Sequence, residues 1–131
     1  MRNPAITAVL SGLLICCAVM VTAFEIEEDT LFAGTGTGGE LRILSTTDTG
    51  IFAPLLRAFQ ATRPDVAIRY TVASSQEVYR ALFEEGAGYD LAISSAMDLQ
   101  MKLANDGLAQ PFRGAAGLDW PAWAHWQDHL F

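Results

Sequence analysis

The order of apolar segments after Glu40 constrains the fold of this chain most strongly. Three short aliphatic runs, each typical of a buried strand, alternate with three amphipathic runs typical of helices. The strands are expected at residues 41–45, 66–72 and 90–93, and the helices at residues 51–62, 74–86 and 96–106. Two parallel strands joined by a helix cross over right-handedly in nearly all proteins. We therefore predict an α/β fold in which three consecutive β-α units form a parallel sheet with helices on both faces.

The first predicted helix, residues 51–62, contains an apolar stripe. Ile51, Leu55 and Phe59 recur every four residues, with Phe52 and Leu56 widening the stripe, and this spacing predicts an amphipathic helix. Because proline is tolerated in the first helical turn, Pro54 places the start of the helix close to itself. The helix is expected to end at Arg63-Pro64, since the residue before a proline disfavours the α conformation.

The other two helices carry capping signals. Ser74 is followed three residues later by Glu77, and Ser95 is followed in the same way by Asp98, so both pairs resemble a capping box. This pattern predicts that the Ser95 hydroxyl caps the third helix and leaves Ser94 free to face a ligand. Two glycines are placed for C-terminal caps, Gly86 and Gly107.

The N-terminal sequence is typical of an export signal. Arg2 precedes an apolar run from Ala5 to Phe24, and the small residues of Val21-Thr22-Ala23 fit a signal peptidase site. Residues 1–23 are therefore predicted to be a cleaved signal peptide, and the mature protein to be periplasmic. An uncleaved membrane anchor is the alternative, because about 20 apolar residues can span a bilayer.

Residues 24–40 are expected to be a flexible linker, because four acidic residues are followed by alternating glycine and threonine. Residues 41–131 would then form the α/β unit. The net charge of the full chain is −7, and removing Arg2 with the signal peptide makes it −8. Such an acidic surface disfavours nucleic acid as a partner. Both cysteines, Cys16 and Cys17, lie in the apolar run, so the mature part has no disulfide framework.

Hydroxyl-rich loops follow all three predicted strands. In a parallel sheet these loops emerge at the carboxyl ends of the strands, where open α/β sheets bind ligands. Each loop supplies at least two hydroxyls although a helix cap needs only one, and helix N-termini attract anions. The candidate ligand-binding residues are Thr46, Thr47, Asp48, Ser74, Ser75, Ser94 and Ser95.

No catalytic constellation is recognised, so we expect a protein that is not an enzyme and needs no cofactor. A hydrolase-like enzyme is disfavoured because no base lies near a serine. His125 and His129 are one helical turn apart, but Trp126 stands where a metalloprotease motif requires glutamate, and no metal site is predicted. The aromatic segment 118–131 carries three tryptophans spaced every three residues, a pattern of core packing or of a surface that awaits a partner.

Residues 41–131 resemble the opening of an extracellular solute-binding protein of an ABC transporter. The stretches "LLRAFQATRPDVAIRY" and "YDLAISSAMDLQMKLANDG" carry the likeness, together with the hydroxyl-rich loop after the first strand. The family includes ferric-iron, polyamine and thiamine binders. Its members are two-lobed and several times longer, and this chain resembles only the first half of lobe one, as a truncated product or a fragment.

The resemblance implies an exported substrate-binding component of an ABC importer. Its partners would be a membrane permease and a small solute such as a metal ion, a polyamine or a small oxyanion. By position, the hydroxyl-rich loops of this chain correspond to the ligand-facing loops of lobe one. Iron-binding relatives place metal ligands where Asp48 and Ser95 stand here, and only Asp48 suits a hard cation. The alternative is a periplasmic sensor or interaction domain that uses the same fold without transport.

Overall fold

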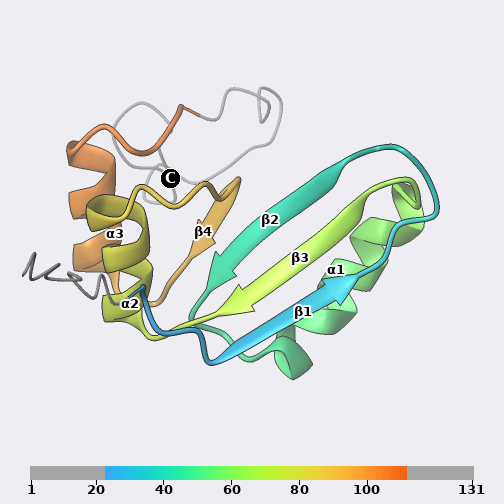
Figure 1. The fold of residues 1–131 in the computed structure, drawn as a ribbon, viewed down its shortest axis with the longest axis horizontal. Helices are drawn as coiled ribbons and strands as arrows, with labels where there is room; N and C mark the ends of the chain where they lie inside the picture. Colours follow the sequence, from blue (N-terminus) through green and yellow to red (C-terminus); the bar gives the residue numbers. More distant parts are fainter. Residues whose placement is uncertain (1–22, 112–131) are drawn as a thin grey trace, which may run out of the picture.

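A computed structural model of the chain describes residues 23–111 (Figure 1). Nearly all of the predicted signal peptide and the whole aromatic segment 118–131 lie outside the described residues. The elements, in chain order, are β1 (Glu28–Phe32), β2 (Glu40–Ser45), α1 (Thr49–Thr62), β3 (Ala67–Val72), α2 (Ser75–Tyr79), the π-helical turn η1 (Arg80–Glu84), β4 (Leu91–Ile93) and α3 (Met97–Asn105).

The four strands form one sheet in the order β1-β3-β2-β4. Strand β2 pairs in parallel with both β3 and β4, which confirms the three consecutive β-α units and the α/β fold. The arrowheads of these three strands point to the same edge of the sheet in Figure 1. The sheet as a whole is mixed, because β1 pairs antiparallel with β3.

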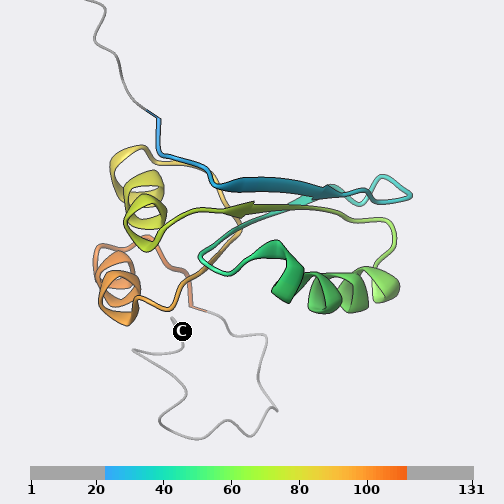
Figure 2. The same cartoon turned by 90° about the horizontal axis from the view of Figure 1, so that it is seen from below.

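Helices cover both faces of the sheet, as predicted. Alternate residues of a strand point to opposite faces, so Ile43 and Leu44 of β2 belong to different apolar clusters. Ile43 packs with Leu56 of α1 on one face, and Leu44 packs with Val78 of α2 on the other. Figure 2 shows α1 along one side of the strands. Tyr70 of β3 is fully buried on the α1 side.

The prediction of a flexible linker over residues 24–40 is wrong, because residues 28–32 form β1. The Arg69 guanidinium donates to Asp29 at 2.8 Å and to Glu40 at 3.1 Å. The Thr71 hydroxyl also donates to the Asp29 carboxylate, at 2.8 Å. The acidic residues therefore serve as partners for side chains of β3. The composition of residues 24–40 alone could not reveal Arg69 and Thr71 as partners of Asp29, because these two residues lie 40 and 42 positions further along the chain.

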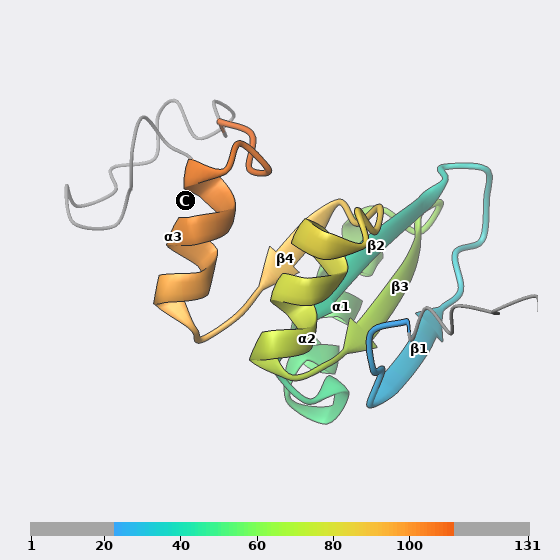
Figure 3. The same ribbon diagram turned by 60° about the vertical axis from the view of Figure 1, so that its left-hand side comes forward.

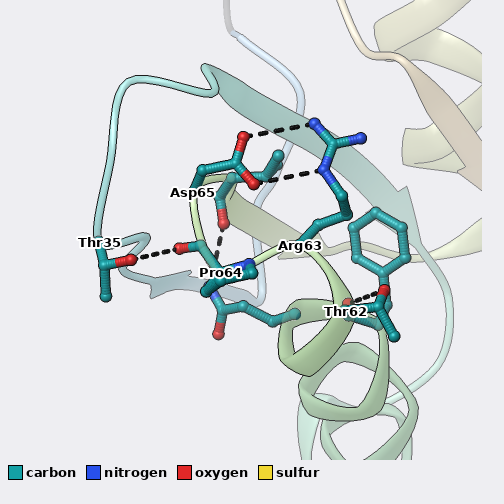
Figure 4. A network of polar contacts seen from close by, with 8 residues as sticks. Thr35, Thr62, Arg63, Pro64 and Asp65 are labelled. Carbon is teal, nitrogen blue, oxygen red and sulfur yellow. Dashed lines mark hydrogen bonds and ion pairs between the residues drawn. The ribbon is translucent and has the colours of Figure 1, made fainter.

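The glycine- and threonine-rich stretch after β1 is held against the turn between α1 and β3. The backbone N–H and the hydroxyl of Thr35 both donate to the Pro64 carbonyl, at 2.7 and 3.0 Å. The Gly38 N–H donates to the Asp65 carbonyl at 3.1 Å. Arg63 closes the turn through its ion pair with Asp65 (Figure 4). Residues 33–39 are thus an ordered connection, since short hydrogen bonds fix them to the body of the fold.

The apolar stripe predicted for α1 is only partly buried, because Leu56 lies in the core and Phe52 packs against it while the other members are exposed. Ile51, Leu55 and Phe59 are exposed to 70%, 60% and 43%, whereas Ala53 and Leu56 are buried. The helix has apolar residues on two faces, and the periodicity could not decide which of them meets the sheet. The residues that recur every four positions lie on the solvent-exposed side of the helix.

The helix ends agree with the capping signals at two glycines. Gly86 and Gly107 adopt positive φ angles of 61° and 81°, the left-handed conformation that glycine tolerates best. At the end of α3, Gly107 N–H donates to Ala104 and Leu108 N–H donates to Leu103, the paired bonds of a Schellman motif. Helix α1 begins at Thr49, earlier than predicted, which places Pro54 beyond the first turn.

Candidate functional site

The three strand-to-helix loops meet at the carboxyl edge of β2, β3 and β4 (Figures 1 and 3), and we call this edge the rim. Thr46 joins the first loop to the third: its N–H donates to the Ile93 carbonyl at 3.0 Å, and its hydroxyl accepts from the Ser95 N–H at 3.4 Å. Ala73 joins the second loop to the first, because its N–H donates to the Ser45 carbonyl at 3.0 Å. The fold therefore brings the candidate residues to one edge, as predicted.

The first loop is supported from the core. The hydroxyl of buried Ser45 accepts from the Thr47 N–H at 3.0 Å. The Tyr70 hydroxyl donates to the Thr47 carbonyl at 2.8 Å. Burial, and then the negative charges of Asp48 and Glu28, raise the pKa of Tyr70, so the phenol keeps its proton to higher pH than an exposed tyrosine does. These bonds fix the backbone of Thr47 and leave the loop little freedom.

Asp48 occupies the N-cap position of α1, yet its carboxylate makes no capping hydrogen bond. Its backbone carbonyl accepts from the Ile51 N–H at 3.0 Å, so the backbone begins the helix without help from the side chain. The exposed carboxylate is therefore available at the rim. A hard cation or an ammonium group is the ligand class that an aspartate of this kind attracts.

Thr49 is a rim residue that our selection from the sequence missed. Its side chain is buried, and its hydroxyl has no hydrogen-bond partner in the structure. A buried hydroxyl without a partner costs about 1–3 kcal/mol, so Thr49 is a polar side chain that the described fold leaves unsatisfied. Thr49 closes the run Ser45-Thr46-Thr47-Asp48-Thr49, and that run of hydroxyls was the signal available in the sequence.

The second loop shows that Ser74 is a helix cap. Its hydroxyl accepts from the Glu77 N–H at 3.3 Å, which confirms that Ser74 caps α2. The Glu77 carboxylate accepts from the Glu25 N–H at 2.8 Å and lies 3.7 Å from Arg80, so it also ties down the start of the described chain. Ser75 is the first residue of α2 and is half-buried.

The third loop reverses the predicted roles of its two serines. The Ser94 hydroxyl accepts from the Ala96 N–H at 3.1 Å, so Ser94 shapes the turn. Helix α3 begins at Met97 with Ala96 at its N-cap, and no side chain caps it. The capping box predicted for Ser95 and Asp98 is therefore wrong, because the helix begins one residue too late to use the Ser95 hydroxyl. Ser95 is the more exposed of the two serines.

The rim combines negatively charged side chains with the positive ends of helices. Each helix start carries one carboxylate, from Asp48, Glu77 or Asp98, and the three loops contain no lysine or arginine. The positive ends of α1 and α3 partly offset these charges. Within residues 23–111, no group of three or more His, Cys, Asp and Glu side chains is placed to hold a metal ion.

A search of protein-family models finds no match, and no curated protein matches the chain. Among solved structures, the chain is similar to the substrate-binding protein of an ABC transporter from Agrobacterium tumefaciens. The two share 35% sequence identity and superpose with a TM-score of 0.71. The match covers 77% of this chain and 32% of that protein, so the chain spans about a third of its length. Within residues 23–111, no helix is long and apolar enough to cross a membrane.

The architecture is therefore that of a fragment of the periplasmic binding protein fold. The similarity agrees with the resemblance inferred from the sequence at the level of ABC-transporter substrate-binding proteins. The narrower assignment to ferric-iron, polyamine and thiamine binders stays a prediction.

Proposed function

We propose that this chain is an exported substrate-binding component of an ABC importer, or the rim-bearing part of one. It would capture a small solute, such as a metal ion, a polyamine or a small oxyanion, and deliver it to a membrane permease. The observation that carries the proposal is the meeting of three hydroxyl-rich loops at one rim, in a fold fragment similar to a substrate-binding protein.

The rim residues divide into supports and ligand contacts in this proposal. Ser74 and Ser94 are supports, because their hydroxyls already accept backbone N–H groups. The contacts are the accessible groups without a partner among the described residues, which are the Asp48 carboxylate and the hydroxyls of Ser75 and Ser95. Thr46 and Thr47 complete the set, since their backbones define the shape of the first loop. This mixture of one carboxylate with several hydroxyls favours the cationic solutes among these candidates, a metal ion or a polyamine.

Export would leave Phe24 as the first residue of the mature protein. The Phe24 side chain packs on the apolar cluster around Leu44 and Val78, and its ring meets Tyr89 edge to face at 6.4 Å. Mass spectrometry of the periplasmic fraction should find a chain that begins at Phe24. A chain with an intact Met1 in the membrane fraction would contradict the cleavage and support an anchor.

Calorimetric titration tests the binding function directly. The chain is titrated with divalent metal ions, with a polyamine and with a small oxyanion. Loss of a hydrogen bond to a charged group costs about 1.5–3 kcal/mol, so Asp48→Asn should lower the affinity for a cationic ligand by roughly tenfold or more. The same substitution should leave an oxyanion bound at least as tightly, because it removes a negative charge.

Asp65→Asn is the matched control for the titrations. It removes the same charge at the turn between α1 and β3 (Figure 4), which precedes β3 and therefore lies at the opposite end of that strand from the rim. Its exposed ion pair with Arg63 contributes little to stability. Affinities that Asp48→Asn leaves unchanged for every ligand class, or equal losses in both variants, would contradict a ligand site at the rim.

A further inference from the structure

The side of α1 that points away from the sheet is apolar along its length. Ile51, Pro54, Leu55 and Ala58 are exposed, and Phe59 flanks them at 43% exposure. We call these five residues the outer face of α1. The inner side of the helix, around Ala53 and Leu56, packs on β2 and β3. Figure 2 shows the sheet on only one side of α1.

A helix with this composition is normally covered on both sides. Arg57 is the single charged residue among the fourteen of α1, and surface helices of soluble proteins usually carry a charged outer face. A contiguous apolar face without an acidic residue is suited to bind another apolar surface. Within residues 23–111, no segment covers the outer face, so its cover has to come from elsewhere.

Segment 118–131 has the complementary composition. It contains all three tryptophans of the chain, Trp120, Trp123 and Trp126, together with Leu130. At about 100° per residue these four side chains fall within about one third of a helical circumference. His125 and His129 fall on the opposite side by the same spacing. As a helix, the stretch from Trp120 to Phe131 would be about 18 Å long, close to the roughly 21 Å of α1.

The connection to the described chain is long enough for contact. The described residues end at Pro111, and the short described stretch between α3 and Pro111 lies on the same side of the sheet as α1 in Figure 2. Six residues lie between Pro111 and Leu118, and the seven Cα-to-Cα steps of an extended chain reach about 24 Å. Tethering also helps, because a short linker holds the segment near α1 at roughly millimolar effective concentration.

We propose that segment 118–131 docks as an amphipathic helix on the outer face of α1. It buries its tryptophans against Ile51, Leu55 and Phe59, and so completes the cover of the first helix. A second copy of the chain is a poorer occupant. One face of a helix about 21 Å long and 10 Å wide offers roughly 200 Å² per partner, far below the ~1,200 Å² in total that stable interfaces bury.

Tryptophan fluorescence tests the docking, because every tryptophan of the full chain lies in the segment in question. The native full chain should emit at shorter wavelength, and be quenched less by acrylamide, than the same chain in denaturant. Leu55→Gln should shift the native emission to longer wavelength and increase quenching. The loss of one leucine contact should lower the ratio of docked to free segment by about tenfold.

Leu31→Gln is the matched control, since Leu31 is 50% exposed and its neighbour Phe32 packs on the α1 side of the sheet. Leu31 therefore points to the opposite face, and its substitution should leave the tryptophan emission unchanged. Circular dichroism checks the fold, and Ile51→Gln replaces Leu55→Gln if that variant unfolds.

Three outcomes would overturn the proposal. Native emission equal to that of the denatured chain would show an undocked segment. Equal shifts in the Leu31 and α1 variants would remove the specificity for α1. A protected emission that fades on dilution, together with a dimer in light scattering, would assign the outer face to a second copy.

Discussion

The Tyr70 hydroxyl donates a hydrogen bond to the Thr47 carbonyl at 2.8 Å, which connects the centre of the core to the first loop of the rim. Tyr70 is fully buried, and its ring stacks on Phe52 of α1 at a centroid distance of 5.6 Å. A single side chain of β3 thus packs against α1 and positions the loop that precedes α1. The shape of the rim depends on the packing of the core for this reason.

Tyr70→Phe should destabilise the protein by about 1 kcal/mol, because the ring packing remains while the Thr47 carbonyl loses its partner. Denaturant melts of the variant and the parent chain measure the difference. Tyr89→Phe is the control, since the Tyr89 ring contacts Phe24 and Arg42 through its faces and edges, which the substitution leaves in place. Equal losses in the two variants would mean that the bond to Thr47 contributes nothing particular.

The same tyrosine predicts a dependence of stability on alkaline pH. Burial raises the pKa of Tyr70 above its ordinary value of 10.0, so the folded state holds the phenol proton more tightly than the unfolded state. Its contribution is fully present below pH 10.0 and is lost as the pH rises through the folded-state pKa. The free energy of unfolding, measured from pH 8 upwards, should therefore fall more steeply above that value in the parent chain than in Tyr70→Phe. Parallel curves would contradict this prediction.

Gly34→Ala should destabilise the protein, because residues 33–39 pass close to the start of β3. A Cβ atom at Gly34 would lie 2.7 Å from the Ala67 nitrogen and 2.7 Å from the Val66 carbonyl carbon, so the backbone would have to move. A Cβ atom at Gly50 in α1 would meet nothing within 4 Å. Gly50→Ala should therefore be neutral or stabilise the helix by up to about 1 kcal/mol. Thermal melts that rank the two variants the other way would refute the packing of this connection.

The serines of the rim should separate into two groups when each is replaced by alanine. Ser74→Ala should cost about 1 kcal/mol, because it removes the cap of α2. Ser94→Ala should also lower stability, since the Ala96 N–H loses its acceptor. Ser95→Ala should stay within about 0.5 kcal/mol of the parent chain. Denaturant melts give the three values.

Ligand titrations of the same variants complete the comparison. If the rim binds the proposed solute, Ser95→Ala should weaken binding although its stability is unchanged. A Ser95→Ala variant that is as destabilised as Ser74→Ala would instead assign Ser95 a structural role and remove it from the proposed site.

Several features of this protein followed from local signals in its sequence. Short aliphatic runs located β2, β3 and β4, and the Ser74 to Glu77 spacing located the start of α2. Gly86 and Gly107 marked the ends of their helices. The β-α order alone predicted that the hydroxyl-rich loops would share one edge of the sheet, because the crossover rule relates chain order to the direction of the strands.

The tertiary structure decided what depends on distant partners. Residues 28–32 form a strand because β3 offers a free edge and Arg69 and Thr71 offer partners for Asp29, none of which is visible in a short acidic segment. The buried face of α1 was chosen by the sheet, since both faces of the helix are apolar. Ser94 replaced Ser95 as a backbone acceptor because α3 begins one residue later than its capping pattern indicates. Periodicity and capping act over a few residues and are encoded locally, whereas pairing and burial depend on which surfaces the folded chain brings together.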